Sequence, residues 1–402
     1  MRITKVRLRQ VEGVLEHPDP FWEERLIRPV DIYPEFKESS GLDYPVPLGN
    51  GRYRLSPTFL EIDTDEGVTG LAGPIYENQA FYIDTQLRAI LEGADPTATE
   101  VLWDKMYRNA IHGRKGDNMM AISAVDIALW DLKGKWLGQP VYKLLGGPTR
   151  DRIPAYASAL GYSLEPDRIK ERVKDFVAQG YTATKWFFRE GPADGKEGIR
   201  KNLEVVAAIR EAAGPDVDIM LDCWNSWDVP YTLKMIDLLE SFDPLWIEEP
   251  VLADKPESYA QIRAASSILI SGGEHEYTRW GFKMLMDMGA MDIYQSDIGW
   301  AGGISEMMKI AALASSYDVK LVPHGGPVPA AAHFLFSQPA STCPLIEFLF
   351  KWEQIGQFFF KRPVEPVNGY VASPEGPGIG WELDESKIES ERGLSYGARG
   401  RP

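Results

Sequence analysis

Three acidic residues in the middle of the chain recur at one interval. Asp222, Glu248 and Glu274 each follow a short apolar run and stand 26 residues apart. A strand, a helix and two loops fill about that interval, so each step is predicted to be one strand–helix unit. Asp297 and His324 follow the next two apolar runs. The carboxyl ends of parallel strands converge in a barrel, so we expect these five side chains to meet where catalytic groups sit.

The three evenly spaced acids offer hard oxygen ligands. Asp222, Glu248 and Glu274 suit Mg²⁺ or Mn²⁺ far better than Zn²⁺. A single acid in a loop is usually only solvated, but three in succession after apolar strands favour a metal site. Glu249 adjoins Glu248, and on a regular strand it would point to the opposite face, so we leave it outside the metal set.

A histidine and an acid are predicted to form a proton-transfer pair. A lone histidine is more often structural, but Asp297 could orient the imidazole of His324 and raise its pKa. Such a pair beside a metal can remove a proton from a carbon next to a carboxylate. Glu347 ends the eighth apolar run and is predicted to donate to the other side of that carboxylate. Lys185, in the second run, is either an active-site cation, which we favour, or an exposed lysine at a strand end.

Three further residues are candidates for substrate binding. His275 follows Glu274 directly, and two adjacent strand-end residues are not expected to face one metal, so its role is substrate contact or none. His17 lies in a segment rich in Pro, acids and aromatics and could recognise a hydroxyl group. Trp300 closely follows Asp297, and it is counted with His275 and His17 as a candidate for substrate binding.

An alternation of strand and helix patterns begins at Ile153 and favours a (β/α)₈ barrel of the TIM type. Each strand is a short apolar run, and the gaps between the runs are long enough for a helix. The strands are expected at 153–159, 182–188, 218–223, 245–249, 269–274, 291–297, 320–324 and 345–349.

The chain outside the barrel is predicted to form an α+β capping domain. Residues 1–146 contain a strand at 3–11, a hairpin at 58–72 and three amphipathic helical patterns, at 81–91, 100–111 and 119–137. Residues 15–54 are expected to be irregular and to order as a lid over the site. The barrel is expected to span 147–352, and the segment 353–402, rich in Pro and Gly, is expected to pack back on the capping domain.

Composition narrows the function classes. A net charge of -16 argues against a nucleic-acid or anionic-membrane surface. The two cysteines have no metal-type spacing, and a disulfide framework is not expected. The first residues alternate like a strand and lack the apolar core of a signal peptide, and no apolar run is long enough to span a membrane. We therefore expect a soluble cytoplasmic protein that acts on a small molecule.

Several longer stretches carry a family likeness. They are 123–132, 143–147 and 246–250, together with 220–224, 271–275, 296–303, 322–325 and 347–349. On the first three, the sequence resembles the mandelate racemase-like branch of the enolase superfamily over nearly its whole length. On the others, it is similar within that branch to the rhamnonate dehydratases.

The resemblance implies roles for the residues at these positions. It implies Mg²⁺ on the three acids, the His324–Asp297 dyad as general base, and Glu347 near the substrate carboxylate. It also implies a capping domain whose mobile loops select the substrate, and assembly as a homo-oligomer, from dimer to octamer.

One departure from the branch favours dehydration. Racemases of this branch carry a Lys-x-Lys pair whose second lysine is the base on the opposite face, whereas here the pair reads Lys185-Trp186-Phe187. Dehydration needs one base, because the imidazolium of His324 can return its proton to the departing 3-hydroxyl in a syn elimination. We therefore expect a Mg²⁺-dependent dehydratase of a sugar acid (an aldonate, rhamnonate-like) that yields a 2-keto-3-deoxy acid. Of the histidines and basic groups that rhamnonate dehydratases carry near the N-terminus, only His17 stands here, which leaves the particular sugar acid open.

Other functions remain open at this point. An epimerase, racemase or cycloisomerase would act on a sugar acid through the same metal-stabilised enediolate. A catalytically silent barrel would serve as a binding or scaffold protein, although the complete set of acids weighs against it. A metal hydrolase with a barrel fold would need histidine-rich ligands for a metal-bound hydroxide, and none of the three predicted metal ligands is His.

Overall fold

Eight parallel strands and eight following helices form the larger part of the molecule. The computed structural model describes residues 1–39 and 43–397. The strand order is β12-β11-β10-β9-β8-β7-β6-β13, and the backbone N–H of Leu321 in β12 reaches the carbonyl of Thr342 just before β13, 2.9 Å away. The strands are β6 (Arg152–Ser158), β7 (Ala183–Phe187), β8 (Asp218–Asp222), β9 (Trp246–Glu248), β10 (Leu269–Gly272), β11 (Ile293–Tyr294), β12 (Lys320–Leu321) and β13 (Ile346–Leu349).

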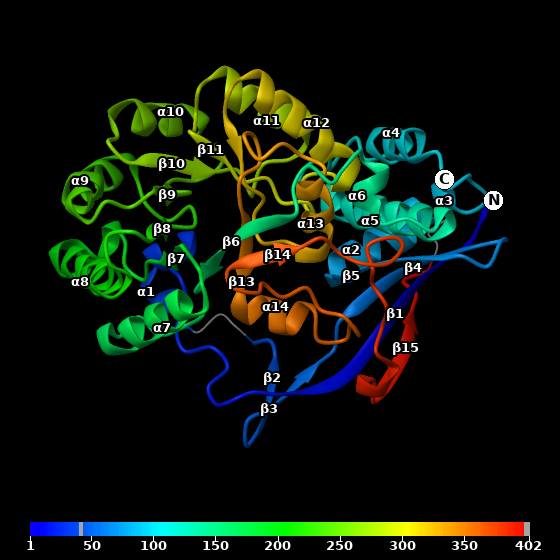
Figure 1. Ribbon diagram of the computed structural model, residues 1–402, viewed down its shortest axis with the longest axis horizontal. Coiled ribbons are helices and arrows are strands. Elements are labelled where there is room, and N and C mark those ends of the chain that lie inside the picture. Colours follow the sequence, from blue (N-terminus) through cyan, green and yellow to red (C-terminus); the bar gives the residue numbers. More distant parts are fainter. Residues whose placement is uncertain (40–42, 398–402) are drawn as a thin grey trace.

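The helices lie outside this curled sheet, as Figure 1 shows for the green, yellow and orange part of the chain. They are α7 (Pro166–Ala178), α8 (Gly195–Ala213), α9 (Val229–Leu239), α10 (Pro256–Ala265), α11 (Thr278–Asp287), α12 (Gly303–Ser316), α13 (Val328–Phe336) and α14 (Phe350–Gly356). The predicted (β/α)₈ barrel with its N-terminal cap is confirmed. The strands are shorter than expected, however, and β11 and β12 end three residues before Asp297 and His324.

A second, antiparallel sheet belongs to the capping domain. Its order is β2-β3-β1-β4-β5, with β15 paired to β1. Strand β1 alternates apolar and polar residues, so one of its faces is buried against helices. The strands are β1 (Ile3–Glu16), β2 (Val46–Gly49), β3 (Arg52–Leu55), β4 (Thr58–Thr64), β5 (Thr69–Ile75) and β15 (Ser390–Leu394).

The long helix α5 (Asp117–Leu137) joins the cap sheet to the barrel. It is buried on most sides because apolar residues surround it, and it packs against both β5 and α12. The other cap helices are α2 (Glu77–Tyr82), which continues through a π-turn into α3 (Arg88–Leu91), α4 (Thr99–Asn109) and α6 (Val141–Leu144). The hairpin and the three predicted helical segments are confirmed, with boundaries shifted by a few residues.

The C-terminal segment adds a strand to each of the two sheets. Strand β15 pairs with β1 of the cap, whereas β14 (Tyr370–Ala372) pairs with β6 of the barrel. The segment after 353 therefore contacts both parts, and the domain limits at 146 and 352 stay a prediction. None of the described helices is long and apolar enough to cross a lipid bilayer.

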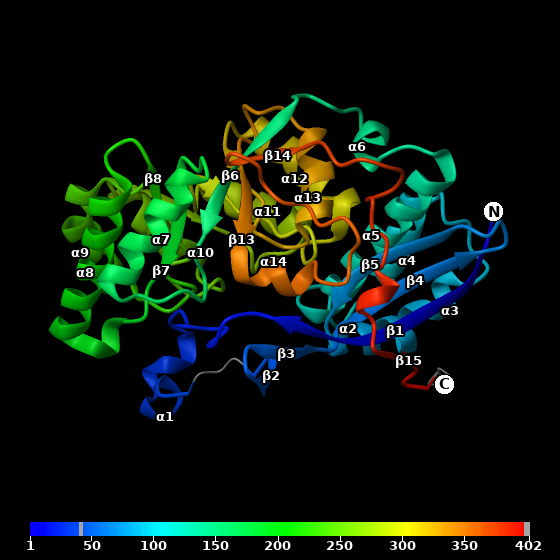
Figure 2. The same cartoon turned by 60° about the horizontal axis from the view of Figure 1, so that its bottom comes forward.

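The expectation of an irregular segment at 15–54 is wrong for part of its length. Strand β1 runs on to Glu16, β2 and β3 form a hairpin, and a 3₁₀ turn leads into the one-turn helix α1 (Pro34–Lys37). In both overall views this blue segment crosses from the cap towards the barrel (Figures 1 and 2), and Lys37 at the end of α1 lies 2.7 Å from Glu190, shortly after β7. We call residues 17–39 the lid segment.

Candidate active site

The three acids at equal spacing are buried at one end of the barrel. Asp222 and Glu248 are the last residues of β8 and β9 and lie side by side in the sheet. Glu274 lies two residues beyond β10. Trp224 joins two of these acids, because its backbone N–H donates to Asp222 Oδ1 (2.9 Å) and its indole N–H to Glu274 Oε1 (3.1 Å). The structure thus brings the predicted metal set together.

Lys185 and Glu347 extend this set towards the barrel axis. Lys185 Nζ lies 2.5 Å from Glu248 Oε1, 2.8 Å from Glu347 Oε1 and 3.6 Å from Asp222 Oδ2. Burial lowers the pKa of Lys185, but Glu248 and Glu347 raise it far above its ordinary value, so it is a cation. Lys185 is therefore not an exposed strand-end lysine, and it is buried in the middle of β7.

Glu347 differs from the expectation in its place along the strand. It is the second residue of β13 rather than its last, which turns its side chain into the barrel. Burial raises the pKa of Glu347, but Lys185 and His324 bring it below its ordinary value. Glu347 accepts a hydrogen bond from the backbone N–H of Gly325 at 2.8 Å, and its role beside the substrate carboxylate stays a prediction.

His324 and Asp297 form the predicted pair. The Nδ1 of His324 lies 2.8 Å from Asp297 Oδ2, and its Nε2 lies 3.2 Å from Glu274 Oε2. Burial lowers the pKa of His324, but Glu274 and Asp297 raise it to about 10. A Cβ added at Gly326 would lie 2.5 Å from Asp297 Oδ1, so the close approach of this loop to the carboxylate requires glycine there.

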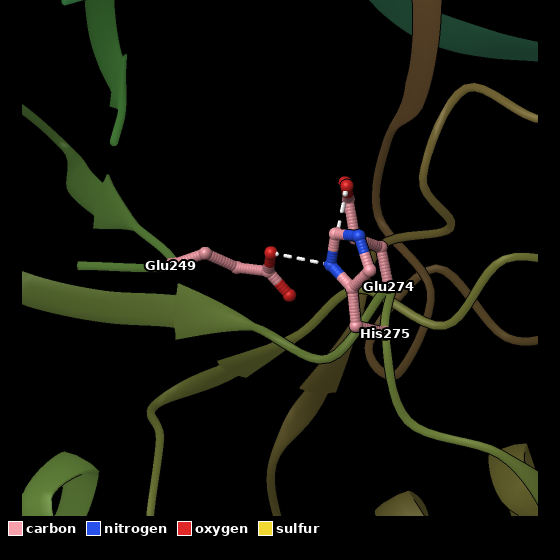
Figure 3. A group of neighbouring side chains, drawn as sticks. All are labelled: Glu249, Glu274 and His275. Atoms are coloured by element: carbon pink, nitrogen blue, oxygen red, sulfur yellow. Dashed lines mark hydrogen bonds and ion pairs between the residues drawn. The ribbon is translucent and has the colours of Figure 1, made fainter. Parts of the chain in front are cut away.

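A second histidine–carboxylate pair lies beside the first. The Nδ1 of His275 is 2.7 Å from Glu249 Oε2 and 3.5 Å from Glu274 Oε1 (Figure 3). Glu249 also accepts from the backbone N–H of Gly273 at 3.2 Å and from the side-chain amide of Asn225. Candidate ligand atoms of Glu249, Glu274 and His275 lie within 4.8 Å of one another, so adjacent residues do face one point, contrary to our expectation.

The backbone explains why strand alternation failed here. Glu249 has φ of +41°, and Gly272 and Gly273 have φ of +156° and +108°. Strands β9 and β10 have therefore ended before Glu249 and before Glu274, and the chain turns each side chain back over the sheet. Glu249, Asn225 and Trp224 are the functional candidates that strand alternation missed, and only their closeness to Asp222 and Glu248 in the sequence could have signalled them.

Aromatic rings line the rim of the site. The ring centroid of Trp300 lies 5.3 Å from that of His324 and 5.7 Å from that of His275. His17 is placed differently. Its Nδ1 contacts the carbonyl of Pro18 at 2.7 Å and its ring packs on Phe21, and no described contact joins it to the acids.

The donor set fits a hard divalent cation. Burial and the neighbouring Glu248 raise the pKa of Asp222, and burial raises the pKa of Glu274 to about 7. Such shifts show that these buried carboxylates lack enough positive charge nearby. The alternative set that includes His275 fits less well. It consists of Glu249, Glu274 and His275, and it offers an imidazole nitrogen where Mg²⁺ prefers oxygen ligands.

Comparisons with known proteins agree with this geometry. The chain is 35% identical to an L-rhamnonate dehydratase of Saccharopolyspora erythraea, over 96% of this chain and 97% of that protein. The crystal structure of a rhamnonate dehydratase from Gibberella zeae complexed with Mg superposes with a TM-score of 0.83 at 31% identity, covering 96% of each chain. The 3,6-anhydro-D-galactonate cycloisomerase of Zobellia galactanivorans superposes with a TM-score of 0.77 at 30% identity, covering 97% of this chain and all of that one.

Two family models divide the chain between them. The N-terminal domain of the mandelate racemase / muconate lactonizing enzyme family matches residues 51–146, and the enolase C-terminal domain-like family matches residues 168–387. The chain therefore belongs to the mandelate racemase / muconate lactonizing enzyme family of the enolase superfamily.

Proposed function

We propose that this chain is a Mg²⁺-dependent dehydratase of a rhamnonate-like sugar acid. It would remove the C2 proton and eliminate the 3-hydroxyl group, releasing water and a 2-keto-3-deoxy acid. The relatives that dehydrate rhamnonate support this class. The homo-oligomer and the cytoplasmic location stay predictions.

The observation that carries the proposal is the one-sided placement of the general base. His324 is oriented by Asp297, and its Nε2 faces Glu274 at 3.2 Å. On the β7 side, Lys185 is held by two carboxylates, and the position of a second lysine is taken by the buried Phe187. Racemisation needs a proton donor and acceptor on both faces of the carbanion, whereas syn elimination needs one group.

The three acids would hold the metal. Bound to Asp222, Glu248 and Glu274, Mg²⁺ would supply the positive charge that offsets the negative charge developing on the substrate carboxylate. Lys185 adds a fixed cation on the same side, and Glu347 keeps that ammonium oriented. These groups are buried, so their electrostatic effect is stronger than it would be in water.

The proton steps belong to His324. With Nδ1 tied to Asp297, its Nε2 can accept the C2 proton and then deliver it to the 3-hydroxyl as the C3–O bond breaks. The proton taken from carbon thus leaves in the water molecule, and the enol that remains tautomerises to the 2-keto acid. The rings of Trp300 and Trp224 beside the histidines would restrict water at this face.

A substrate panel tests the reaction class. Purified protein with Mg²⁺ is mixed with mono- and dicarboxylic sugar acids, and semicarbazide detects new 2-keto acids. We expect a product on at least one aldonate with the formula of substrate minus water. A product of unchanged formula, or silence across the panel with hydrogen exchange at C2 in D₂O, would contradict dehydration.

The histidine assignment is tested by substitution. His324→Asn should lose activity by on the order of 10²–10⁴-fold, the usual contribution of general acid–base catalysis. His112→Asn is the matched control, because His112 is exposed in a turn of the cap. A folded His324→Asn variant with nearly full activity would overturn the role of His324.

One observation favours a second candidate, an epimerase or cycloisomerase. His275 is also paired with a carboxylate, and 29% of its side chain is exposed beside Trp300. It could act on another carbon of the same intermediate, and the cycloisomerase from Zobellia galactanivorans is similar in fold. The unchanged formula of the product would identify that reaction in the panel.

A further inference from the structure

One face of α5 in the capping domain contacts the barrel at the turn where α12 begins. Ser123, Asp126 and Trp130 lie three and four residues apart, so they share this face. Opposite them lies the turn 302–305, where α12 begins. This stretch of α5 is part of the motif 123–132, and nothing in the proposed reaction uses it.

Hydrogen bonds from the cap satisfy the polar groups of this turn. The backbone N–H of Gly302 donates to Ser123 Oγ (2.9 Å), and Ser305 donates to Asp126 through its backbone N–H (2.9 Å) and its hydroxyl (2.6 Å). The indole of Trp130 donates to Ser305 Oγ (2.9 Å). The indole of Trp103 in α4 donates to the carbonyl of Gly302 at 2.8 Å and completes the set.

The turn 302–305 and helix α5 are also closely packed against each other. Gly303 has φ of +78°, and a Cβ there would lie 2.5 Å from Asp126 Oδ2. Ser123, Asp126 and Ser305 are buried. A shift of the turn would therefore break several hydrogen bonds or collide with the helix.

The same turn ends the loop that carries Asp297 and Trp300. The carbonyl of Asp297 accepts from the backbone N–H groups of Trp300 (3.1 Å) and Ala301 (2.8 Å), and Gly302 follows at once. Asp297 Oδ1 accepts from the N–H of Gly299 at 2.6 Å, while its Oδ2 faces His324. The place of this carboxylate is thus set by a loop whose far end is held by the cap.

We propose that Ser123 and Asp126 are positioning residues for the His324–Asp297 pair. By holding the turn 302–305, they keep the carboxylate of Asp297 against His324 Nδ1 and the ring of Trp300 beside the imidazole. The consequence for turnover rests on the proposed function, whereas the consequence for the hydrogen bond between His324 and Asp297 does not.

The kinetic test compares two buried acids of the same helix. Asp126→Ala frees the turn. Asp131→Ala is the control, because Asp131 is equally buried but accepts from Leu71 and Ile379 (both 2.8 Å), away from the catalytic loop. Displacing a catalytic group by about 1 Å can cost on the order of 10²-fold in rate. We expect kcat of Asp126→Ala to fall by about 10- to 100-fold with little change in KM, and kcat of Asp131→Ala to stay within about threefold for each folded molecule.

A spectroscopic test is independent of turnover. In protein labelled with ¹⁵N-histidine, the proton on His324 Nδ1 that is shared with Asp297 gives a downfield resonance, assigned by its loss in His324→Asn. This resonance should broaden or vanish in Asp126→Ala and persist in Asp131→Ala. An unchanged resonance in Asp126→Ala overturns the positioning role, while silence of the wild-type protein on the panel would overturn only the proposed function.

Conservative variants cover the case in which Asp126→Ala does not fold. Asp126→Asn keeps an acceptor for Ser305 N–H and should retain most of kcat. Ser123→Ala removes one acceptor, for Gly302 N–H, and should lower kcat and weaken the His324 resonance partially. Equal kcat and equal resonances in Ser123→Ala and the wild-type protein would contradict the proposal.

Discussion

At the scale of single residues, the site contains more buried acid than buried base. Asp222, Glu248, Glu274 and Glu347 are all buried, and Lys185 is the cation that contacts three of them. The basic groups that lie near Glu274 are the imidazoles of His275 and His324. A general base must be neutral to accept a proton, yet the pKa of His324 is raised to about 10 by this arrangement, against the opposing effect of burial. The binding of a cation at Glu274 therefore has a consequence for His324.

Adding Mg²⁺ should release protons from the protein. Once a divalent cation neutralises Glu274, the largest charge that raises the pKa of His324 to about 10 is offset, so this pKa falls and more of the imidazole is neutral at pH 8. Proton release on Mg²⁺ titration in weakly buffered solution at pH 8 measures this. His324→Asn should release fewer protons while still binding Mg²⁺. Equal release from the variant and the wild-type protein would show that His324 is not the group coupled to the metal.

At the scale of elements, a buried lysine is one of the groups that fasten the lid segment to the barrel. Lys351, at the start of α14, contacts the carbonyl of Phe21 and lies 2.9 Å from Glu23 Oε1, under the ring of Tyr162. The ring of Trp22 packs on that of Trp352, with 5.1 Å between centroids. These contacts fix the part of the lid segment closest to β13.

Lys351→Met should release the lid segment without unfolding the barrel. The thioether chain fills similar space but removes the hydrogen bonds of a charged group, which are worth about 1.5–3 kcal/mol each. We expect faster hydrogen exchange in residues 17–39 and a higher KM, with exchange in the barrel strands unchanged. Lys361→Met is the control, because the Lys361–Glu382 pair is exposed and contributes little. Unchanged exchange in residues 17–39 would show that Lys351 does not hold the lid segment.

The type of each element could be predicted from the sequence where apolar residues follow a regular local pattern. It could be predicted less well where the backbone departs from regular helix or strand geometry. Apolar runs at a steady interval gave the barrel and brought Asp222, Glu248 and Glu274 together. Strand alternation misplaced Glu249 because its φ is positive, and no periodicity reports such a turn. The hairpin of β2 and β3 was missed because each strand is only four residues long and every residue of β2 is exposed. The contacts of His17 depend on the lid segment, which packs through Phe21 and Trp22 rather than by a pattern of its own.

At the scale of the whole molecule, buried polar contacts join the cap to the barrel. Asp126 and Trp103 reach the start of α12, and Asp131 binds the C-terminal segment at Ile379. A further contact lies at the other end of the cap, where His333 of α13 accepts from the backbone N–H of Tyr142 at 3.1 Å. The site therefore lies in a molecule whose two parts are cross-connected, which is why a residue of the cap can influence a catalytic loop of the barrel.

The junction at His333 should make stability depend on pH. Burial lowers the pKa of His333 to about 4, whereas in the unfolded chain it is near 6.5. Between these values the unfolded state binds the extra proton, so stability is intact above pH 6.5 and falls as the pH drops towards 4, by on the order of 3 kcal/mol in all. His333→Asn keeps an acceptor for Tyr142 but does not titrate, so urea unfolding at pH 7, 5.5 and 4.5 should show a shallower loss of stability than in the wild-type protein. Parallel losses in the two proteins would assign the acid sensitivity to other groups and leave His333 a purely structural contact.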